Sequence, residues 1–292
     1  MIKTILPVLR CLLAGRVIGR QEYRNGYDSA SPTYGAWLGI MAKHTEKIVR
    51  PEDLEPVAAS SRPIRILDLS CGTGYITGRI LRLVPSGQVR ITGVDISGEM
   101  IGRYRQSFSS SGVTAVTADG FEFVRERENN AFDIVYCGWA LPYYKPRKLI
   151  REIGRILVPG GIAGFISNEK GTLAGIQEAY METMGNHAGQ VRNIDTIYRR
   201  LPKDRTAMNG WFRNAGFTVL DSGQGEETVS FSRGNDLLEW LRKTGAVAGS
   251  EKIFADPEAV EADLISRIEG HTRTGSGFRV NHKFAYGIYR KG

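Results

Sequence analysis

The sequence is poor in the residues that build disulfide frameworks and metal sites. Only three cysteines occur among 292 residues, and the odd number and wide spacing of Cys11, Cys71 and Cys137 predict neither a disulfide framework nor a zinc motif. The four histidines show no metal-ligand spacing either. We therefore predict no metal, and a reducing compartment such as the cytoplasm.

An uninterrupted apolar run long enough to cross a membrane is also missing. Residues 2–17 are apolar at helical spacing, but Arg10 and Arg16 interrupt them and Pro7 would kink a helix or delay its start. A cleaved signal peptide is disfavoured because Arg10 lies inside the would-be apolar region. We expect an amphipathic helix packed on the domain. The alternative is a helix that makes peripheral contact with a membrane surface.

The sequence has no compact basic block, although its formal net charge is +8 and its isoelectric point is about 9.4. A basic balance favours acidic partners such as nucleic acid or anionic lipid. Here the lysines and arginines are scattered along the chain, and no RNA-binding module is appended. We expect a small-molecule substrate, keep RNA as the rival, and make no prediction of the oligomeric state beyond leaving an oligomer open.

From residue 64 onward, short apolar segments alternate with helical patterns. This alternation is typical of a mostly parallel sheet with helices on both faces. The predicted strands are residues 64–69, 89–94, 113–117, 132–136, 162–166, 217–220 and 278–289. The predicted helices are residues 74–83, 100–108, 149–157, 206–215, 237–241 and 259–268, with further helix in the polar segment 169–201.

A glycine-rich turn follows the first of these strands. It reads Asp68-Leu69-Ser70-Cys71-Gly72-Thr73-Gly74, and glycines at such a turn let the backbone approach a ligand closely. A carboxylate at Asp68 would repel a pyrophosphate, so this turn is unlike that of a nicotinamide-dependent oxidoreductase. It suits a ligand that carries positive charge, such as an amine or a sulfonium.

Two more acids follow the next two predicted strands. Asp95, at the end of the second strand, is placed to accept hydrogen bonds from ribose hydroxyls. Asp119, after the third strand, can accept from an adenine amino group while Phe121 packs on the base. Each acid alone is equally well read as a helix cap or turn residue. Three acids at three successive strand ends favour a nucleoside site.

Five segments together resemble the class I S-adenosylmethionine-dependent methyltransferases, in the branch related to ubiquinone and menaquinone biosynthesis. They are Leu67-Asp68-Leu69-Ser70-Cys71-Gly72-Thr73-Gly74, Val94-Asp95-Ile96-Ser97, Ala118-Asp119, Phe132-Asp133-Ile134-Val135 and Leu157-Val158-Pro159-Gly160-Gly161. The resemblance covers about residues 64–168 and concerns the cofactor and the fold far more than the substrate.

The resemblance implies a Rossmann-like α/β fold with a mostly parallel seven-stranded sheet. Three parts are expected: residues 1–60 as an N-terminal helical extension, 61–168 as the cofactor-binding core, and 169–292 as helical lid insertions plus the last two strands of the same sheet. The implied cofactor is S-adenosyl-L-methionine, which leaves as S-adenosyl-L-homocysteine.

The resemblance also assigns cofactor roles to particular residues. Asp68 and Gly72 would face the methionine part, Asp95 would hold the ribose, and Asp119 would bind the adenine amino group. The full set implied is Tyr34, Asp68, Ser70, Gly72, Gly74, Asp95, Ile96, Asp119, Gly120, Phe121 and Cys137. Ser70 stands where the family usually has glycine, and we expect a small serine to be tolerated if its φ is negative.

Methyl transfer from a sulfonium is an in-line displacement, so the enzyme mainly supplies alignment and desolvation. We expect the acceptor beyond the fourth strand, near Trp139, Leu141 and Tyr144, whose rings and side chains suit an apolar or planar molecule. Core packing is the alternative for each. His187 and Tyr143 are the candidate catalytic residues. An RNA methyltransferase and a non-catalytic S-adenosylmethionine-binding protein remain the alternative functions.

Overall fold

The computed structural model describes residues 2–58, 62–109 and 112–292, which form two compact units. The sheet unit comprises Trp37–Lys170, Arg200–Gly225 and Phe284–Gly292. The helical unit comprises the described part of Met1–Ala36, together with Gly171–Arg199 and Glu226–Lys283. Each unit is described below by itself, and the predicted three-part division of the chain stays a prediction.

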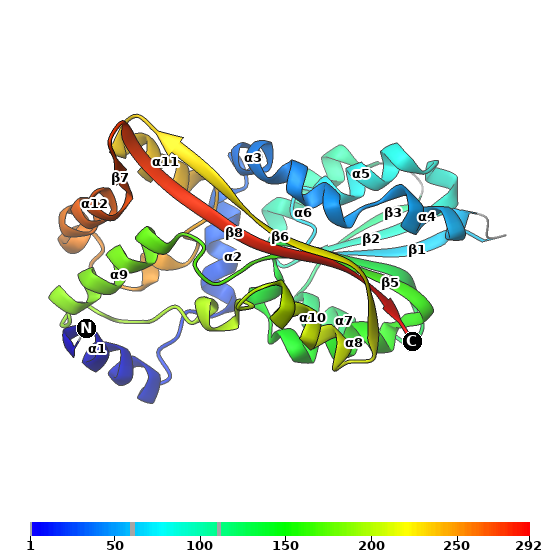
Figure 1. The fold of residues 1–292 in the computed structure, drawn as a ribbon, viewed down its shortest axis with the longest axis horizontal. Coiled ribbons are helices and arrows are strands. Elements are labelled where there is room, and N and C mark those ends of the chain that lie inside the picture. The colour runs from blue at the N-terminus through cyan, green and yellow to red at the C-terminus, as the bar shows by residue number, and fades with distance from the viewer. Residues whose placement is uncertain (1, 59–61, 110–111) are drawn as a thin grey trace. The chain divides into compact units, whose positions relative to one another are not determined.

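The strands of the sheet run in the order β3-β2-β1-β4-β5-β8-β6 (Figure 1). Their bounds are β1 (Ile64–Leu69), β2 (Val89–Asp95), β3 (Val113–Thr117), β4 (Phe132–Gly138), β5 (Leu157–Asn168), β6 (Phe217–Phe231), β7 (Arg273–Thr274) and β8 (Gly277–Lys291). β1 to β5 pair in parallel, and β8 pairs antiparallel with β5. The predicted mostly parallel sheet is confirmed. The two-residue β7, which pairs with β8, was not expected.

Helices cover both faces of the sheet in the sheet unit (Figure 1). They are α3 (Gly35–Thr45), α4 (Pro51–Ala58), α5 (Tyr75–Leu83), α6 (Gly98–Ser107), α7 (Gly120–Arg125), α8 (Pro146–Ile156) and α10 (Arg205–Arg213). α8 shows why these segments fold so: Pro146 suits the first helical position, and Leu149, Ile150 and Ile153 are all buried on one side. The strands they cover, such as β4, are buried along most of their length.

The helical unit contains α1 (Ile2–Leu13), α2 (Arg20–Ala30), α9 (Ala174–Asn186), α11 (Gly234–Lys243) and α12 (Glu258–Thr272). Its core is built from α9, α11, α12 and the first part of β8. Within the segment 169–201, helix covers less than the polar pattern suggested. Backbone groups near Ile194 instead pair with other segments, since Ile18 N donates to Ile194 O at 2.9 Å and Arg192 N to Ile253 O at 2.8 Å. In the described chain, no helix combines the length and apolarity needed to span a membrane.

A buried carboxylate at the start of β4 ties this strand to β1. Asp133 is 5% exposed and accepts two hydrogen bonds from the Arg62 guanidinium, both at 2.7 Å. It also accepts from Arg65 N at 2.8 Å and from the Arg65 side chain at 3.1 Å. Burial alone would raise the pKa of Asp133, but these hydrogen bonds outweigh burial and hold the pKa well below its ordinary value.

Replacing this carboxylate should therefore weaken the sheet unit. We expect Asp133→Asn to lower the free energy of unfolding by about 1.5–3 kcal/mol at pH 7, the usual range for hydrogen bonds to a charged group. A depressed pKa in the folded state means that this stability is present above the unfolded pKa, ~3.9, and is lost as the pH falls through the folded value. Urea denaturation at several pH values should show the gap between wild type and variant closing in acid.

Glu52→Gln provides the matched control, because Glu52 is 60% exposed and pairs with Arg50 at 3.4 Å in the same unit. An exposed pair contributes roughly 0–1 kcal/mol. Equal losses in the two variants, or a gap for Asp133→Asn that does not change with pH, would contradict this account of Asp133.

Candidate functional site

Three acids meet at one edge of the sheet unit. Asp68 lies near the end of β1, Asp95 ends β2, and Asp119 follows β3. Because β3, β2 and β1 are neighbours and run in parallel, their carboxyl ends share an edge. The structure thus brings together the three carboxylates that the sequence places far apart.

The glycine turn after β1 is fastened to β2 by backbone and side chain. Cys71 N donates to Val94 O at 3.0 Å, and Gly72 N donates to one carboxylate oxygen of Asp95 at 2.9 Å. The other oxygen of Asp95 accepts from Ser97 N at 2.9 Å. Asp95 therefore fixes the turn and the start of α6 at once.

Gly74 shows why this turn needs glycine. It has φ of +91°, and a Cβ on it would lie 2.3 Å from the ring of Phe108. A left-handed backbone with no space for a side chain accepts only glycine without rearrangement. The turn is consequently compact enough to bring its backbone close to a ligand.

Asp119 is the N-cap of α7. Its Oδ1 accepts from Phe121 N and from Glu122 N, both at 3.0 Å. The capping role considered for these acids is thus realised here. Capping also fixes the direction of the carboxylate that is expected to bind the adenine amino group. The buried Gly120 and the half-buried Phe121 follow Asp119 directly in the chain.

Asp68 is buried, with 1% of its surface exposed. Its Oδ2 accepts from Thr77 Oγ1 at 2.8 Å and from Thr77 N at 3.2 Å, whereas Oδ1 has no hydrogen-bond partner among the described residues. Burial raises the pKa of Asp68 to about 7, against the hydrogen bonds from Thr77, and Asp95 adds to the rise. A buried carboxylate oxygen without a partner is costly. A cationic amine or sulfonium would relieve that cost, so the residue fits the expected cofactor.

Ser70 adopts a left-handed backbone with φ of +57°, so the negative φ that was the condition for tolerating a serine here is not met. The conformation costs about 1–2 kcal/mol for a residue with a Cβ. Its Oγ lies 2.6 Å from the Tyr144 hydroxyl, a hydrogen bond that a glycine could not make. That bond helps the serine to occupy a position shaped for glycine.

The Tyr144 hydroxyl lies among the groups expected to bind the cofactor. A Cβ on Gly120 would be 2.3 Å from it. Burial raises the pKa of Tyr144 well above its ordinary value, and the charges of Asp95 and Asp119 act in the same direction. Tyr144 was expected to line the acceptor site, and here it borders the glycine turn.

Trp139, beyond β4, is held rigidly. It has φ of +65°, unusual for a bulky side chain, and its Nε1 donates to Thr45 Oγ1 at 2.8 Å. Its ring meets those of Trp37 and Phe284 edge-on, with centroids 5.2 Å and 5.7 Å away. Residues with a strained backbone are common at functional sites, and Trp139 is such a residue directly after the end of β4.

The other predicted residues of the sheet unit lie around these elements. Cys137 is fully buried in β4 and pairs in register with Leu69, and Leu141 is fully buried in the core. Ile96 is half-buried directly after Asp95. The carbonyl of Tyr143 accepts from Arg200 at 3.4 Å.

Tyr34 and His187 belong to the helical unit. The ring of Tyr34 lies 6.1 Å from that of Tyr27, edge to face. His187 follows α9, and its Nε2 lies 3.1 Å from a carboxylate oxygen of Asp263. Their predicted roles toward the cofactor and the methyl acceptor stay predictions.

Sequence reasoning missed the hydrogen-bonded chain behind Asp68. Thr77 Oγ1 joins Asp68 to the Tyr104 hydroxyl, which lies 2.9 Å away on α6. The close approach of Tyr104 depends on Gly93, where a Cβ would lie 2.6 Å from the tyrosine ring. A glycine within the predicted second strand was the only available signal.

Comparison with known proteins agrees with this geometry. Residues 66–161 match the family described as a methyltransferase domain. A malonyl-[acyl-carrier protein] O-methyltransferase of Halalkalibacterium halodurans is 22% identical over 234 residues, which cover 78% of this chain and 83% of that protein. A demethylmenaquinone methyltransferase of Staphylococcus aureus is 26% identical over 173 residues, covering 58% of this chain and 69% of that protein.

A solved structure from Bacillus halodurans, whose name assigns it provisionally to the methyltransferases, shares the fold. It has 14% sequence identity and a TM-score of 0.51, and the match covers 83% of this chain and 99% of that one. With the acids and the glycine turn in place at the ends of β1, β2 and β3, these likenesses support a class I, S-adenosylmethionine-dependent methyltransferase.

Proposed function

We propose that the enzyme transfers a methyl group from S-adenosylmethionine to a small-molecule acceptor, with the cofactor held at the edge formed by β1, β2 and β3. The observation that carries this proposal is the convergence of Asp68, Asp95 and Asp119 around the glycine turn. Each acid suits one part of the cofactor, and the unpartnered Oδ1 of Asp68 suits its positive charge.

Within this proposal each residue has a role. Asp95 accepts from the ribose hydroxyls, Ile96 and Phe121 pack against adenine, and Asp119 accepts from its amino group. The backbone of Ser70, Gly72, Gly74 and Gly120 borders the cofactor closely, because glycine or a small side chain stands at each position. The backbone at Cys137 and the side chain of Tyr34 meet the methionine amine and carboxylate.

S-adenosylmethionine supplies a methyl group that is already activated by its sulfonium. When bound, the cofactor would present this methyl carbon to the acceptor's electron pair, and the electrons of the carbon–sulfur bond would go to sulfur. The protein contributes alignment and removal of water. Trp139, Leu141 and Tyr144 are the proposed acceptor contacts, and Tyr143 or His187 would orient the acceptor or take a proton from it where one must leave.

The names of two relatives support a small-molecule acceptor. Their names specify a malonyl group on a carrier protein and demethylmenaquinone, and neither acceptor is a nucleic acid.

The cysteines of the chain are buried free thiols in the structure. Free thiols suit the reducing cytoplasm, where we place the enzyme.

A membrane surface is the second contact that we propose. α1 exposes Ile5, Leu6, Leu9 and Leu13, and Leu13 is 89% exposed. Its opposite side is occupied, since Pro7 is buried and Cys11 is fully buried. Exposed apolar side chains on a basic protein fit the surface of a bilayer that contains anionic lipid.

Asp95→Asn tests the cofactor site. Loss of the charge should weaken S-adenosylhomocysteine binding about 10- to 150-fold in calorimetry, the equivalent of ~1.5–3 kcal/mol for hydrogen bonds to a charged group. Transfer of labelled methyl from S-adenosylmethionine to a protein-free metabolite extract should fall in parallel, and total RNA should remain unlabelled.

Asp221→Asn is the control. The Asp221 side chain is 42% exposed in the same unit, and its ion pair with Arg50 is long, at 3.7 Å. The control variant should bind the nucleoside as wild type does, and both variants should keep cooperative melting curves. Undiminished binding by Asp95→Asn, or labelling of RNA in place of the metabolites, refutes the proposal.

The Ser70–Tyr144 hydrogen bond predicts that the effect of Ser70→Gly on stability changes sign when Tyr144 is replaced by phenylalanine. Tyr144→Phe should destabilise the protein by about 0.5–1.5 kcal/mol. With the hydrogen bond gone, adding Ser70→Gly should recover about 0.5–1 kcal/mol, because relief of the left-handed strain exceeds the entropy cost of glycine. Ser70→Ala, which keeps the strain, should recover nothing. If Ser70→Gly destabilises the protein equally with and without Tyr144→Phe, the hydrogen bond does not compensate for the backbone strain at Ser70.

Membrane contact predicts that α1 controls vesicle binding. Leu6→Asp together with Leu13→Asp should reduce co-sedimentation with phosphatidylcholine–phosphatidylserine vesicles at least about tenfold, since each buried leucine contributes ~1.5–3 kcal/mol. Met181→Asp, at an exposed apolar position on α9, is the matched control and should bind as wild type does. Unchanged vesicle binding by the double variant, or a loss confined to self-association without vesicles, excludes the membrane contact.

A further inference from the structure

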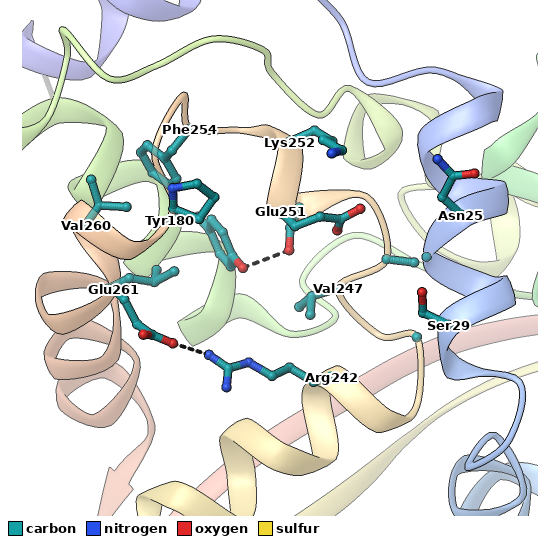
Figure 2. Close-up of a pocket in the computed structure, with 16 residues that line it drawn as sticks. Asn25, Ser29, Tyr180, Arg242, Val247, Glu251, Lys252, Phe254, Val260 and Glu261 are labelled. Carbon is teal, nitrogen blue, oxygen red and sulfur yellow. Dashed lines mark hydrogen bonds and ion pairs between the residues drawn. The ribbon is translucent and has the colours of Figure 1, made fainter.

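The helical unit contains a cavity of about 510 Å³ (Figure 2). Its walls come from α2, α9, α11, α12 and the segment between α11 and α12. The volume falls within the range of roughly 300–1,000 Å³ that is usual for small-molecule sites. None of its lining residues is among those proposed to bind the methyl donor or acceptor.

One wall of the cavity is apolar. Phe254 and Val260 stand beside the ring of Tyr180 on one side of Figure 2. They are only 4% and 1% exposed, so they support this wall from behind. The half-buried Tyr180 and Leu264, which also line the cavity, supply its apolar surface. A flat apolar ring fits such a wall, because aromatic faces and edges pack well on one another.

The opposite wall is polar and belongs to α2. Asn25 and Ser29 project from this helix on the other side of Figure 2. Asn25 Oδ1 accepts from Gln21 Nε2 at 2.8 Å, which orients the amide so that its nitrogen can donate elsewhere. A serine hydroxyl can both donate and accept. This wall therefore suits a hydroxyl or carbonyl group.

Charge at the cavity is balanced. Arg242 is paired with Glu261, and this ion pair lines the cavity (Figure 2). Glu251 and Lys252 add one charge of each sign at its other edge. The Tyr180 hydroxyl lies 2.8 Å from Ser250 Oγ, and burial raises the pKa of this tyrosine, so it adds no charge. A balanced lining gives no preference to a strongly anionic or cationic molecule.

We propose that this cavity is a second small-molecule site, which binds an uncharged, ring-bearing compound with a hydroxyl or carbonyl group. The ring lies against Tyr180 and Leu264, which Phe254 and Val260 support from behind, and the polar group meets Ser29 and Asn25. This site goes beyond methyl transfer and does not depend on S-adenosylmethionine being bound in the sheet unit.

1-Naphthol is a suitable probe, because it joins a flat apolar ring to a single hydroxyl. Isothermal titration calorimetry should detect saturable binding with one site. Ser29→Trp, an exposed position on α2, should fill the cavity and weaken binding at least tenfold. Ser232→Trp is the matched control, since Ser232 is an exposed serine of the helical unit that does not line the cavity. It should bind 1-naphthol as wild type does.

Two related probes and one second variant sharpen the test. Naphthalene, which lacks the hydroxyl, and 1-naphthoate, which is charged, should each bind several-fold more weakly than 1-naphthol. Ser29→Ala keeps the cavity open and should reduce the preference for 1-naphthol over naphthalene. Absence of 1-naphthol binding, equal binding by Ser29→Trp and wild type, or tighter binding of 1-naphthoate would each overturn the proposal. S-adenosylhomocysteine titrated into the same samples reports separately on the cofactor site.

Discussion

The carboxylate of Asp95 holds together the edge formed by β1 and β2. One oxygen accepts from the glycine turn at Gly72 and the other accepts from Ser97, so a single side chain joins the loop after β1 to the start of α6. The turn could otherwise open, because its glycines have little intrinsic conformational preference. Pairing of β1 with β2 along their whole length places Asp95 within reach of that turn. The edge proposed to bind the nucleoside is thus a consequence of sheet register, and the carboxylate proposed to bind its ribose is also a structural one.

The charge of Asp68 depends on the ligand that the edge is built for. Its carboxylate is buried, Thr77 satisfies one oxygen, and burial with the neighbouring Asp95 raises its pKa to about 7. Near neutral pH the residue can therefore exist in either form. A cation beside it favours the ionised form and lowers that pKa. Burial away from water makes the ionised carboxylate of Asp68 costly when no cation is bound. The same burial strengthens its attraction for a sulfonium or an amine.

The sheet and the acids were predictable because both depend on local patterns. β1 and β3 begin and end where their apolar runs do, and Asp68, Asp95 and Asp119 lie at the edge expected for them. The conformation of Ser70 was not predictable, because it depends on a hydrogen bond to Tyr144, which is distant in sequence. The C-terminal end of β6 was missed for a similar reason. This strand continues from the predicted residues 217–220 to Phe231, and its alternating exposed residues carry little signal of their own. β8 was predicted to within two residues at each end.

The positive charge of the chain also finds its explanation in long-range contacts. Arg62 and Arg65 are both committed to Asp133. Arg155 donates to the carbonyls of Arg127 at 2.6 Å and Val124 at 3.0 Å, which closes the C-terminal end of α7. Arginines used this way serve the fold, because their guanidinium groups satisfy backbone oxygens and a buried carboxylate. Neither the acidic edge of the sheet unit nor the charge-balanced cavity of the helical unit offers a basic surface. A net charge of +8 is thus compatible with uncharged and cationic ligands at these two places.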